Sequence, residues 1–194
     1  DKIIFNNASF EILSGQKIGL IGPNGSGKTT FLKMLMGTLQ PDQGSIHLSR
    51  GAKYGYFDQG HLSLHLDNNM VEELVKEHIE LDENDAKALL GQFNFKGDTV
   101  EKSIKTLSGG ERARLSLLKL LMQPYNFLIL DEPTNHMDIQ SKKAIESALN
   151  TYTGAVIVVS HDRTFLDAVC DTIFLITDQT INEYHGNYTM FKEQ

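Results

Sequence analysis

Apolar residues recur at alternate positions over residues 3–12 and then form a short run over 17–21. Both patterns predict strands, and both lead into a glycine-rich segment. From Lys28 to about Met36 the spacing becomes that of a helix. Two further short strands are expected at 45–48 and 53–57, after a turn that contains proline and glycine.

The pattern changes to helices over residues 61–106. A helix is expected at 70–80 and another at 85–93. The first of these carries four apolar residues on one face: Val71, Leu74, Val75 and Ile79. This stretch therefore predicts a small helical subdomain inserted into the rest of the fold.

The second half of the chain alternates between helices and strands. A strongly amphipathic helix is expected at 111–122, followed at 127–130 by an apolar run typical of a buried parallel strand. The remaining expected elements are a helix at 139–152, a strand at 155–159, a helix at 164–169, and strands at 173–176 and 181–184. This alternation predicts an α/β fold with a mostly parallel sheet that is covered on both faces.

We expect residues 1–194 to form one domain. Residues 1–58 and 108–194 would form its α/β core, with antiparallel strands near the N-terminus, and residues 60–107 would form the helical insertion and the loop after it. A hydrophobic content of 40% is sufficient for one core with an appended subdomain. Because the chain begins at Asp1, already in a strand-like pattern, we expect it to be an excised piece of a longer protein.

Composition narrows the class of protein. The net charge of −7 argues against a broad basic face for nucleic acid. No apolar run approaches the roughly 18 to 20 residues of a membrane span, so no membrane insertion is expected. The single cysteine, Cys170, excludes an internal disulfide and fits a cytoplasmic location, with a buried thiol as the expected state.

The glycine-rich segment has the spacing of a phosphate-binding loop. Its glycines let successive backbone N–H groups turn toward phosphate oxygens at the start of the following helix. In this template Lys28 reaches the β- and γ-phosphates and Thr29 offers its hydroxyl to Mg²⁺. The expected nucleotide-binding residues are Gly22, Pro23, Asn24, Gly25, Ser26, Gly27, Lys28, Thr29 and Thr30.

Two carboxylates follow the apolar run at 127–130. Asp131 closes this buried strand, where a carboxylate is costly unless a cation meets it, and bound Mg²⁺ would be that cation. Glu132 comes next and is the candidate for polarising the attacking water. The plainer alternative for such a pair is a role in capping a helix or on the surface.

Two polar residues after other strands complete the expected catalytic group of Glu132, His161, Lys28 and Gln59. Gln59 follows the strand at 53–57, where its amide would contact both Mg²⁺ and the water. His161 follows the strand at 155–159, on the side of an α/β sheet where ligands collect, and would contact the γ-phosphate and hold Glu132. A surface glutamine and an ordinary hydrogen-bonded histidine are the alternatives.

Ser108, Gly109 and Gly110 open a second helix with a phosphate-binding start. The loop at 22–30 already provides one phosphate-binding helix start for a nucleotide. We therefore expect the helix start at 108–110 to bind the ATP of a partner domain in a head-to-tail pair. A helix N-cap without a ligand is the alternative. His61 and His65 have a spacing that can chelate a metal, but no acidic residue stands between them, and a surface loop is expected there.

These segments, in this order, resemble the ATP-binding cassette family. The matching motifs are Walker A at Gly22 to Thr29, the Q-loop at Gln59, the signature at Leu107 to Glu111, Walker B at Leu128 to Glu132, the D-loop around Asp138 and the switch His161. The tracts at 131–138 and 160–167 resemble the ABC-F branch, apart from Met137, where that branch usually has leucine. The tracts at 91–98 and 184–188 resemble its second cassette.

The resemblance implies a P-loop NTPase of the ABC type that hydrolyses ATP with Mg²⁺ held by Thr29, Gln59 and Asp131. It further implies that a second ABC domain, in the same parent chain or a homodimer, meets Leu107, Ser108, Gly109, Gly110, Glu111 and Asp138. For an ABC-F protein it implies ribosome binding by the full-length protein, in translation or in antibiotic resistance. The ATPase subunit of a membrane transporter is the alternative. Phe5 is a poor candidate for stacking on adenine.

Overall fold

The computed structural model describes residues 3–58, 60 and 63–193 of the chain. These residues form two compact units. The sheet unit comprises residues 1–56, 124–132 and 153–194, and the helical unit comprises 57–123 and 133–152. Each unit is described separately below.

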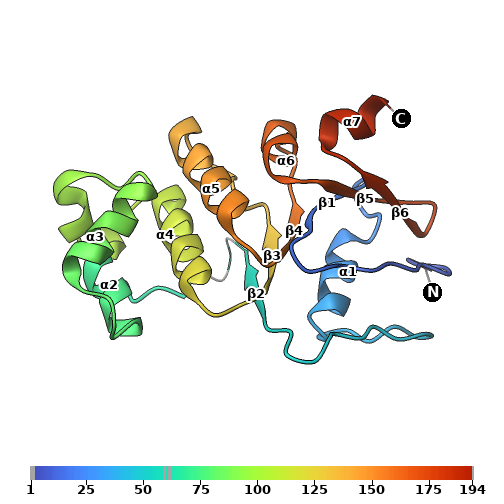
Figure 1. The fold of residues 1–194 in the computed structure, drawn as a ribbon, viewed down its shortest axis with the longest axis horizontal. Helices are drawn as coiled ribbons and strands as arrows, with labels where there is room; N and C mark the ends of the chain where they lie inside the picture. Colours follow the sequence, from blue (N-terminus) through green and yellow to red (C-terminus); the bar gives the residue numbers. More distant parts are fainter. Residues whose placement is uncertain (1–2, 59, 61–62, 194) are drawn as a thin grey trace. The chain divides into compact units, whose positions relative to one another are not determined.

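A six-stranded sheet forms the centre of the sheet unit, in the order β2-β3-β4-β1-β5-β6 (Figure 1). β1 pairs in parallel with β4 and β5, β4 pairs in parallel with β3, and β6 is antiparallel to β5. The strands are β1 (Lys17–Ile21), β2 (Tyr54–Phe57), β3 (Phe127–Asp131), β4 (Ala155–Val159), β5 (Thr172–Thr177) and β6 (Thr180–His185). The prediction of a mostly parallel α/β sheet is confirmed.

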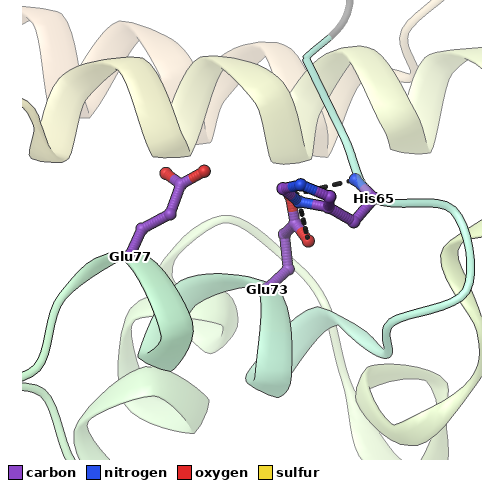
Figure 2. A group of neighbouring side chains, drawn as sticks. All are labelled: His65, Glu73 and Glu77. Carbon is purple, nitrogen blue, oxygen red and sulfur yellow. Dashed lines mark hydrogen bonds and ion pairs between the residues drawn. The ribbon is translucent and has the colours of Figure 1, made fainter.

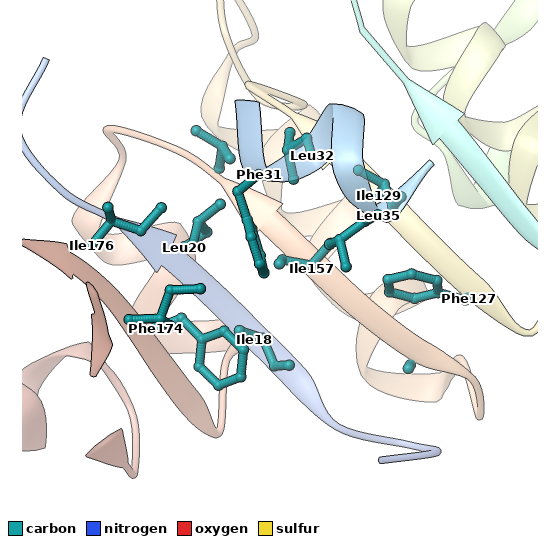
Figure 3. Packing of buried hydrophobic residues seen from close by; sticks show 13 residues of the cluster. Ile18, Leu20, Phe31, Leu32, Leu35, Phe127, Ile129, Ile157, Phe174 and Ile176 are labelled. Carbon is teal, nitrogen blue, oxygen red and sulfur yellow. The ribbon is translucent and has the colours of Figure 1, made fainter. Parts of the chain in front are cut away.

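Alternation along β1 assigns its residues to two faces of the sheet. Ile18 and Leu20 belong to a cluster with Phe31 of helix α1 (Lys28–Leu35), as Figure 3 shows. Gly19 points the other way, because a Cβ there would lie 3.3 Å from both Cys170 Sγ and the Leu166 side chain of helix α6 (Arg163–Val169). Helices α1 and α6 therefore cover opposite faces of β1.

The expected antiparallel strands near the N-terminus are not formed. Residues 3–12 and 45–48 have no strand assignment. The alternation over 3–12 reflects burial of one side without a partner strand, since Phe10 packs edge-on against Phe31 with ring centroids 4.8 Å apart. β5 does pair antiparallel with β6, and the turn residues Asp178 and Gln179 between them both have positive φ, as a two-residue hairpin requires.

The helical unit contains four α-helices and two short 3₁₀ helices among its described residues. They are α2 (Met70–Glu77), α3 (Glu83–Gln92), η1 (Gly97–Glu101), η2 (Ile104–Thr106), α4 (Gly109–Met122) and α5 (Ile139–Thr151). By their contacts α4 and α5 group with the insertion helices, although the sequence placed them in the α/β core. The single-domain organisation itself stays a prediction.

Helix α2 ends earlier than the sequence predicted. Its C-cap is His78, whose backbone has left the helical conformation with φ −128° and ψ 87°. Asp82 begins α3 by accepting hydrogen bonds from the N–H groups of Asn84 and Asp85. Ile79 falls between these two caps and is 95% exposed, so its placement on the buried face was wrong. Strong local capping outweighed one further apolar position in the helical pattern.

Candidate functional site

The predicted phosphate-binding loop joins β1 to α1 and contains two glycines, Gly22 and Gly27, that leave no room for a side chain. A Cβ at Gly22 would lie 2.6 Å from the Ile176 carbonyl oxygen, and one at Gly27 would lie 2.5 Å from the Ile4 side chain. Gly27 is also the N-cap of α1, with φ 110°, and no side chain caps this helix. The first turn of α1 is therefore open to an anion.

Lys28 lies folded over its own loop. Its Nζ donates hydrogen bonds to the carbonyl oxygens of Gly22, at 2.8 Å, and Pro23, at 3.0 Å. Ser26 Oγ is buried and has no hydrogen-bond partner within the described part of the chain. A phosphate oxygen would accept a hydrogen bond from the Ser26 hydroxyl and would be a stronger acceptor for the Lys28 ammonium than the two carbonyls.

Most of the other residues predicted to bind nucleotide are exposed to solvent. Pro23, Asn24 and Gly25 are exposed, as is Thr29, whereas Thr30 is half-buried. Phe5 is half-buried near Phe31, with ring centroids 6.2 Å apart. Phe5 packs against the core cluster and stays a poor candidate for stacking on adenine.

Asp131 and Glu132 stand where β3 ends. Asp131 is paired in register with Val159, the last residue of β4, and the Glu132 N–H donates to the Val159 carbonyl at 2.8 Å. Glu132 has φ 50°, a conformation that L-residues rarely adopt, so its carboxylate leaves the strand in a different direction from that of Asp131.

His161 meets Glu132 from the end of β4. The His161 N–H donates to Glu132 Oε2 at 3.4 Å, and His161 Nε2 lies 3.6 Å from Glu132 Oε1. Burial raises the pKa of the Glu132 carboxyl, His161 and Lys28 oppose this rise, and the charge of Asp131 adds to it. A carboxylate with a raised pKa is a better proton acceptor than an ordinary one, as a residue that polarises water requires.

The sheet unit thus brings together the loop at 22–30 and three residues from other strand ends, Asp131, Glu132 and His161. A cavity of about 350 Å³ lies beside the loop and His161 and is lined in part by Lys28, Ser160 and His161. The carboxyl ends of parallel strands are the usual ligand-binding edge of such a sheet. Gln59 and His61 lie outside the described residues.

The signature residues lie in the helical unit. Ser108 caps α4, where its hydroxyl accepts from the Glu111 N–H at 3.2 Å and its own N–H donates to Glu111 Oε2 at 2.8 Å. Leu107 is buried and anchors this start. A Cβ on Gly109 would meet no atom within 4 Å, whereas one on Gly110 would lie 2.8 Å from the His136 carbonyl oxygen.

Asp138 caps the other helix of this region, α5. Its carboxylate accepts from the Ser141 N–H at 3.0 Å and from the Ser141 hydroxyl at 2.5 Å. These two hydrogen bonds, and then the nearby charge of Arg114, hold the pKa of Asp138 below its usual range. Asp138 is therefore a firmly ionised cap whose side chain is still 65% exposed.

A cluster that the sequence did not reveal surrounds Glu73 in the helical unit (Figure 2). His65, Glu73 and Glu77 bring potential metal-ligating atoms within 4.8 Å of one another. However, Lys119 Nζ lies 2.5 Å from Glu73 Oε1 and 2.6 Å from Glu77 Oε1, so an ammonium already neutralises both carboxylates. We therefore assign an ion-pair network there and no metal site.

Two charged residues inside apolar helical faces were the signal for this network. Glu73 is 1% exposed between Met70 and Leu74, and Lys119 is 7% exposed beside Leu118. Burial opposes ionisation of Glu73, but hydrogen bonds from Lys119 and Asn68 hold its pKa below the ordinary value. Buried charges of this kind occur almost only in pairs.

Comparison with known proteins agrees with this geometry. The family model described as ABC transporter matches residues 5–135. The class defined by the fold and the candidate site is therefore the ATP-binding cassette ATPase domain. The chain belongs to the ABC transporter family.

Several curated relatives match nearly the whole chain. It is 43% identical to the putative ATP-binding protein YdiF of Bacillus subtilis over 98% of its length, and 41% identical to ABC transporter F family member 2 of Arabidopsis thaliana over 100%. It is 38% identical to the probable ATP-binding protein YheS of Escherichia coli over 100%. The chain spans about 30% of the length of these relatives.

Two solved structures share the fold. One is a dimer of the ATP-binding cassette MJ0796 in a post-hydrolysis state with ADP and Pi, with a TM-score of 0.73, 20% identity, and coverage of 94% of this chain and 90% of that one. The other is RNase-L inhibitor, with a TM-score of 0.70, 29% identity, and coverage of 84% and 32%. Within the part of this chain that is described, no helix is both long and apolar enough to cross a bilayer.

Proposed function

We propose that this chain binds ATP with Mg²⁺ at its phosphate-binding loop and hydrolyses it to ADP and phosphate. The observation that carries the proposal is the position of Glu132, which faces His161 beside the charge of Lys28 and has a raised pKa. In this role Glu132 accepts a proton from the attacking water while His161 holds the carboxylate in place. Lys28 leaves the carbonyls of its own loop and binds the β- and γ-phosphates.

The residues assigned to Mg²⁺ fit a hard cation. Thr29 offers an exposed hydroxyl at the start of α1, and Asp131 offers a carboxylate at the end of β3. Oxygen ligands of this kind are those that Mg²⁺ prefers, with the remaining positions left to water and phosphate. Gln59 would add an amide oxygen. When bound, the ion would neutralise charge on the transferred phosphoryl group.

A second cassette completes the site in this proposal. Ser108, Gly109 and Gly110 lie at the start of α4, outside the sheet unit that carries the chain's own phosphate loop. They would meet the ATP of a partner cassette, either in the same longer protein or in a second copy. MJ0796, a protein of the same fold, forms a dimer with ADP and Pi, which supports the pairing of two cassettes.

For the longer protein we propose ATP-dependent binding to the ribosome from the cytoplasm, because F family members occur among the relatives that match the whole chain. We further propose that the chain is the second cassette of that protein. The ATPase subunit of a membrane transporter is the competing function, since the cassette motifs alone would serve it equally. Nucleotide-dependent cosedimentation of the full-length protein with ribosomes favours the first, and copurification with a membrane-spanning subunit favours the second.

The variant Glu132→Gln tests the hydrolytic role. It should bind ATP with unchanged affinity and lower turnover by about 100-fold or more, because the amide cannot accept the proton. Glu183→Gln on the exposed face of β6 is the matched control and should keep full turnover. Undiminished hydrolysis by Glu132→Gln, measured at a concentration that permits pairing of cassettes, would remove Glu132 from the mechanism.

A further inference from the structure

Arg114 is a buried cation on the same face of α4 as the signature glycine Gly110. The two residues are one helical turn apart, so their side-chain positions lie one above the other. Arg114 is only 6% exposed, and its guanidinium carbon lies 4.1 Å from the centroid of the Phe95 ring. Burying a guanidinium costs free energy of folding unless it is paired, so the partners of Arg114 indicate which segment it fixes in place.

The partners of Arg114 belong to the cap of α5. Arg114 Nη1 donates a hydrogen bond to Ser141 Oγ and lies 3.7 Å from Asp138 Oδ2. Ser141 in turn donates to the same carboxylate through both its hydroxyl and its N–H. Arg114, Ser141 and Asp138 thus form one connected polar group, in which the arginine belongs to the signature helix and the aspartate to the D-loop.

A second contact joins the same two elements one turn earlier. The His136 carbonyl oxygen approaches Gly110 so closely that a Cβ there would lie only 2.8 Å away. His136 itself has φ 59°, a left-handed conformation that turns its backbone toward the helix. The D-loop, defined here as residues 134–138, is therefore held against α4 at two levels.

We propose that Arg114 is a positioning residue that locks the D-loop to the signature helix. Ser108, Gly109 and Asp138 would then meet an ATP-loaded second cassette as one rigid surface. This inference rests on the proposed pairing of cassettes. It adds Arg114 as the residue that holds Asp138 in a fixed position relative to Ser108 and Gly109. Because Arg114 and its partners all lie in the helical unit, its loss should weaken pairing and leave ATP binding by the chain's own loop intact.

The test is ATP-dependent association of the chain in the Glu132→Gln background, measured by sedimentation velocity over a range of protein concentrations. Arg114→Lys and Arg114→Met should weaken association by about tenfold or more, while the affinity for a fluorescent ATP analogue at high dilution changes by less than about twofold. Lysine is included because it keeps the charge but lacks the planar guanidinium that lies over the Phe95 ring while Nη1 contacts Ser141 and Asp138.

Lys119→Gln is the matched control. It also removes a buried cation from α4, but Lys119 pairs with Glu73 and Glu77 of α2 rather than with the D-loop. All variants are compared at a temperature at which each is folded. Association equal to that of the parent in the Arg114 variants, or an equal loss in Lys119→Gln, would overturn the inference.

Hydrogen exchange in the unpaired chain separates this inference from the proposed function. Arg114→Met should raise amide exchange over residues 134–141 by about tenfold relative to α2 and α3, whereas Lys119→Gln, which unpairs Glu73 and Glu77, should give no such excess over residues 134–141. If the parent does not associate with ATP, the proposed pairing fails, and the exchange result still decides whether Arg114 locks the loop. Unchanged exchange in Arg114→Met would show that it does not.

Discussion

The imidazole of His161 and the carboxylate of Glu132 face each other, 3.6 Å apart, although the two residues are 29 positions apart in the sequence. Parallel pairing of β3 with β4 explains this contact, because it brings the ends of both strands to one edge. The pairing also places Glu132 where burial raises its pKa. The properties of this pair lead to a prediction about stability as well as catalysis.

Glu132→Gln should stabilise the fold at neutral pH. A carboxyl group whose pKa is higher in the folded than in the unfolded state favours folding when protonated, and this contribution is lost as pH rises through the folded pKa. Glutamine resembles the protonated form, so we expect the melting temperature at pH 7 to rise by about 1–3 °C. Calorimetry at pH 7 and pH 4 would check this, since the difference between variant and parent should shrink at the lower pH.

Lys28→Ala should weaken ATP binding by at least about tenfold without lowering stability appreciably. Within the described residues, the lysine donates to the carbonyls of Gly22 and Pro23 at a partly exposed position, and water can replace those bonds. Equilibrium titration with a fluorescent ATP analogue and thermal unfolding are the two measurements. Lys33→Ala, on the exposed side of α1, is the control. Unchanged ATP affinity in Lys28→Ala would contradict the phosphate role.

Gly110→Ala and Gly109→Ala form a matched pair. Alanine at position 110 brings its Cβ against the His136 carbonyl, which must shift, so we expect a loss of about 1–3 kcal/mol in the free energy of unfolding. Alanine at 109 meets no atom and should be neutral or stabilise by up to about 1 kcal/mol, since alanine favours helices. Urea unfolding of both variants gives the comparison. Equal stability of the two would show that the D-loop does not approach Gly110.

Lys119→Met should be among the most destabilising single changes in the helical unit. It leaves Glu73 buried without its cation, which typically costs about 3–5 kcal/mol. The double variant Lys119→Met with Glu73→Leu should recover much of that loss, because neither charge then remains. A urea-unfolding cycle of the single and double variants measures the coupling. Additive effects in this cycle would mean that the pair contributes little.

Local patterns predicted the parallel sheet well. Runs such as 155–159 indicated buried parallel strands, because such runs depend on neighbouring residues. The spacing from Gly22 to Lys28 is equally local, and its phosphate-binding role stays a prediction. The alternation over 3–12 misled, since packing against Phe31 buries one side of a segment as well as strand pairing does. Ile79 misled for a different reason: α2 ends at its C-cap His78 and α3 begins at its N-cap Asp82, so Ile79 lies in the loop between the two helices.

Long-range polar contacts could not be predicted. Arg114 and Ser141 are 27 positions apart, and Glu73 and Lys119 are 46 apart, so no local pattern links the members of either pair. Glu73 and Lys119 each interrupt an apolar helical face, which is a local signal of a buried charge. The sequence could not say which opposite charge would meet each of them, because that depends on how the helices pack.

The two helix starts of this chain differ in their readiness for a ligand. No side chain caps the amides at the beginning of α1 by a hydrogen bond, whereas at α4 the hydroxyl of Ser108 already accepts from the Glu111 amide. If cassettes pair as proposed, the triphosphate of the partner must compete with this internal hydrogen bond, while the chain's own triphosphate meets a helix start that no side chain caps. Occupancy would then proceed in a fixed order, with each protein loading its own nucleotide before it engages that of its neighbour.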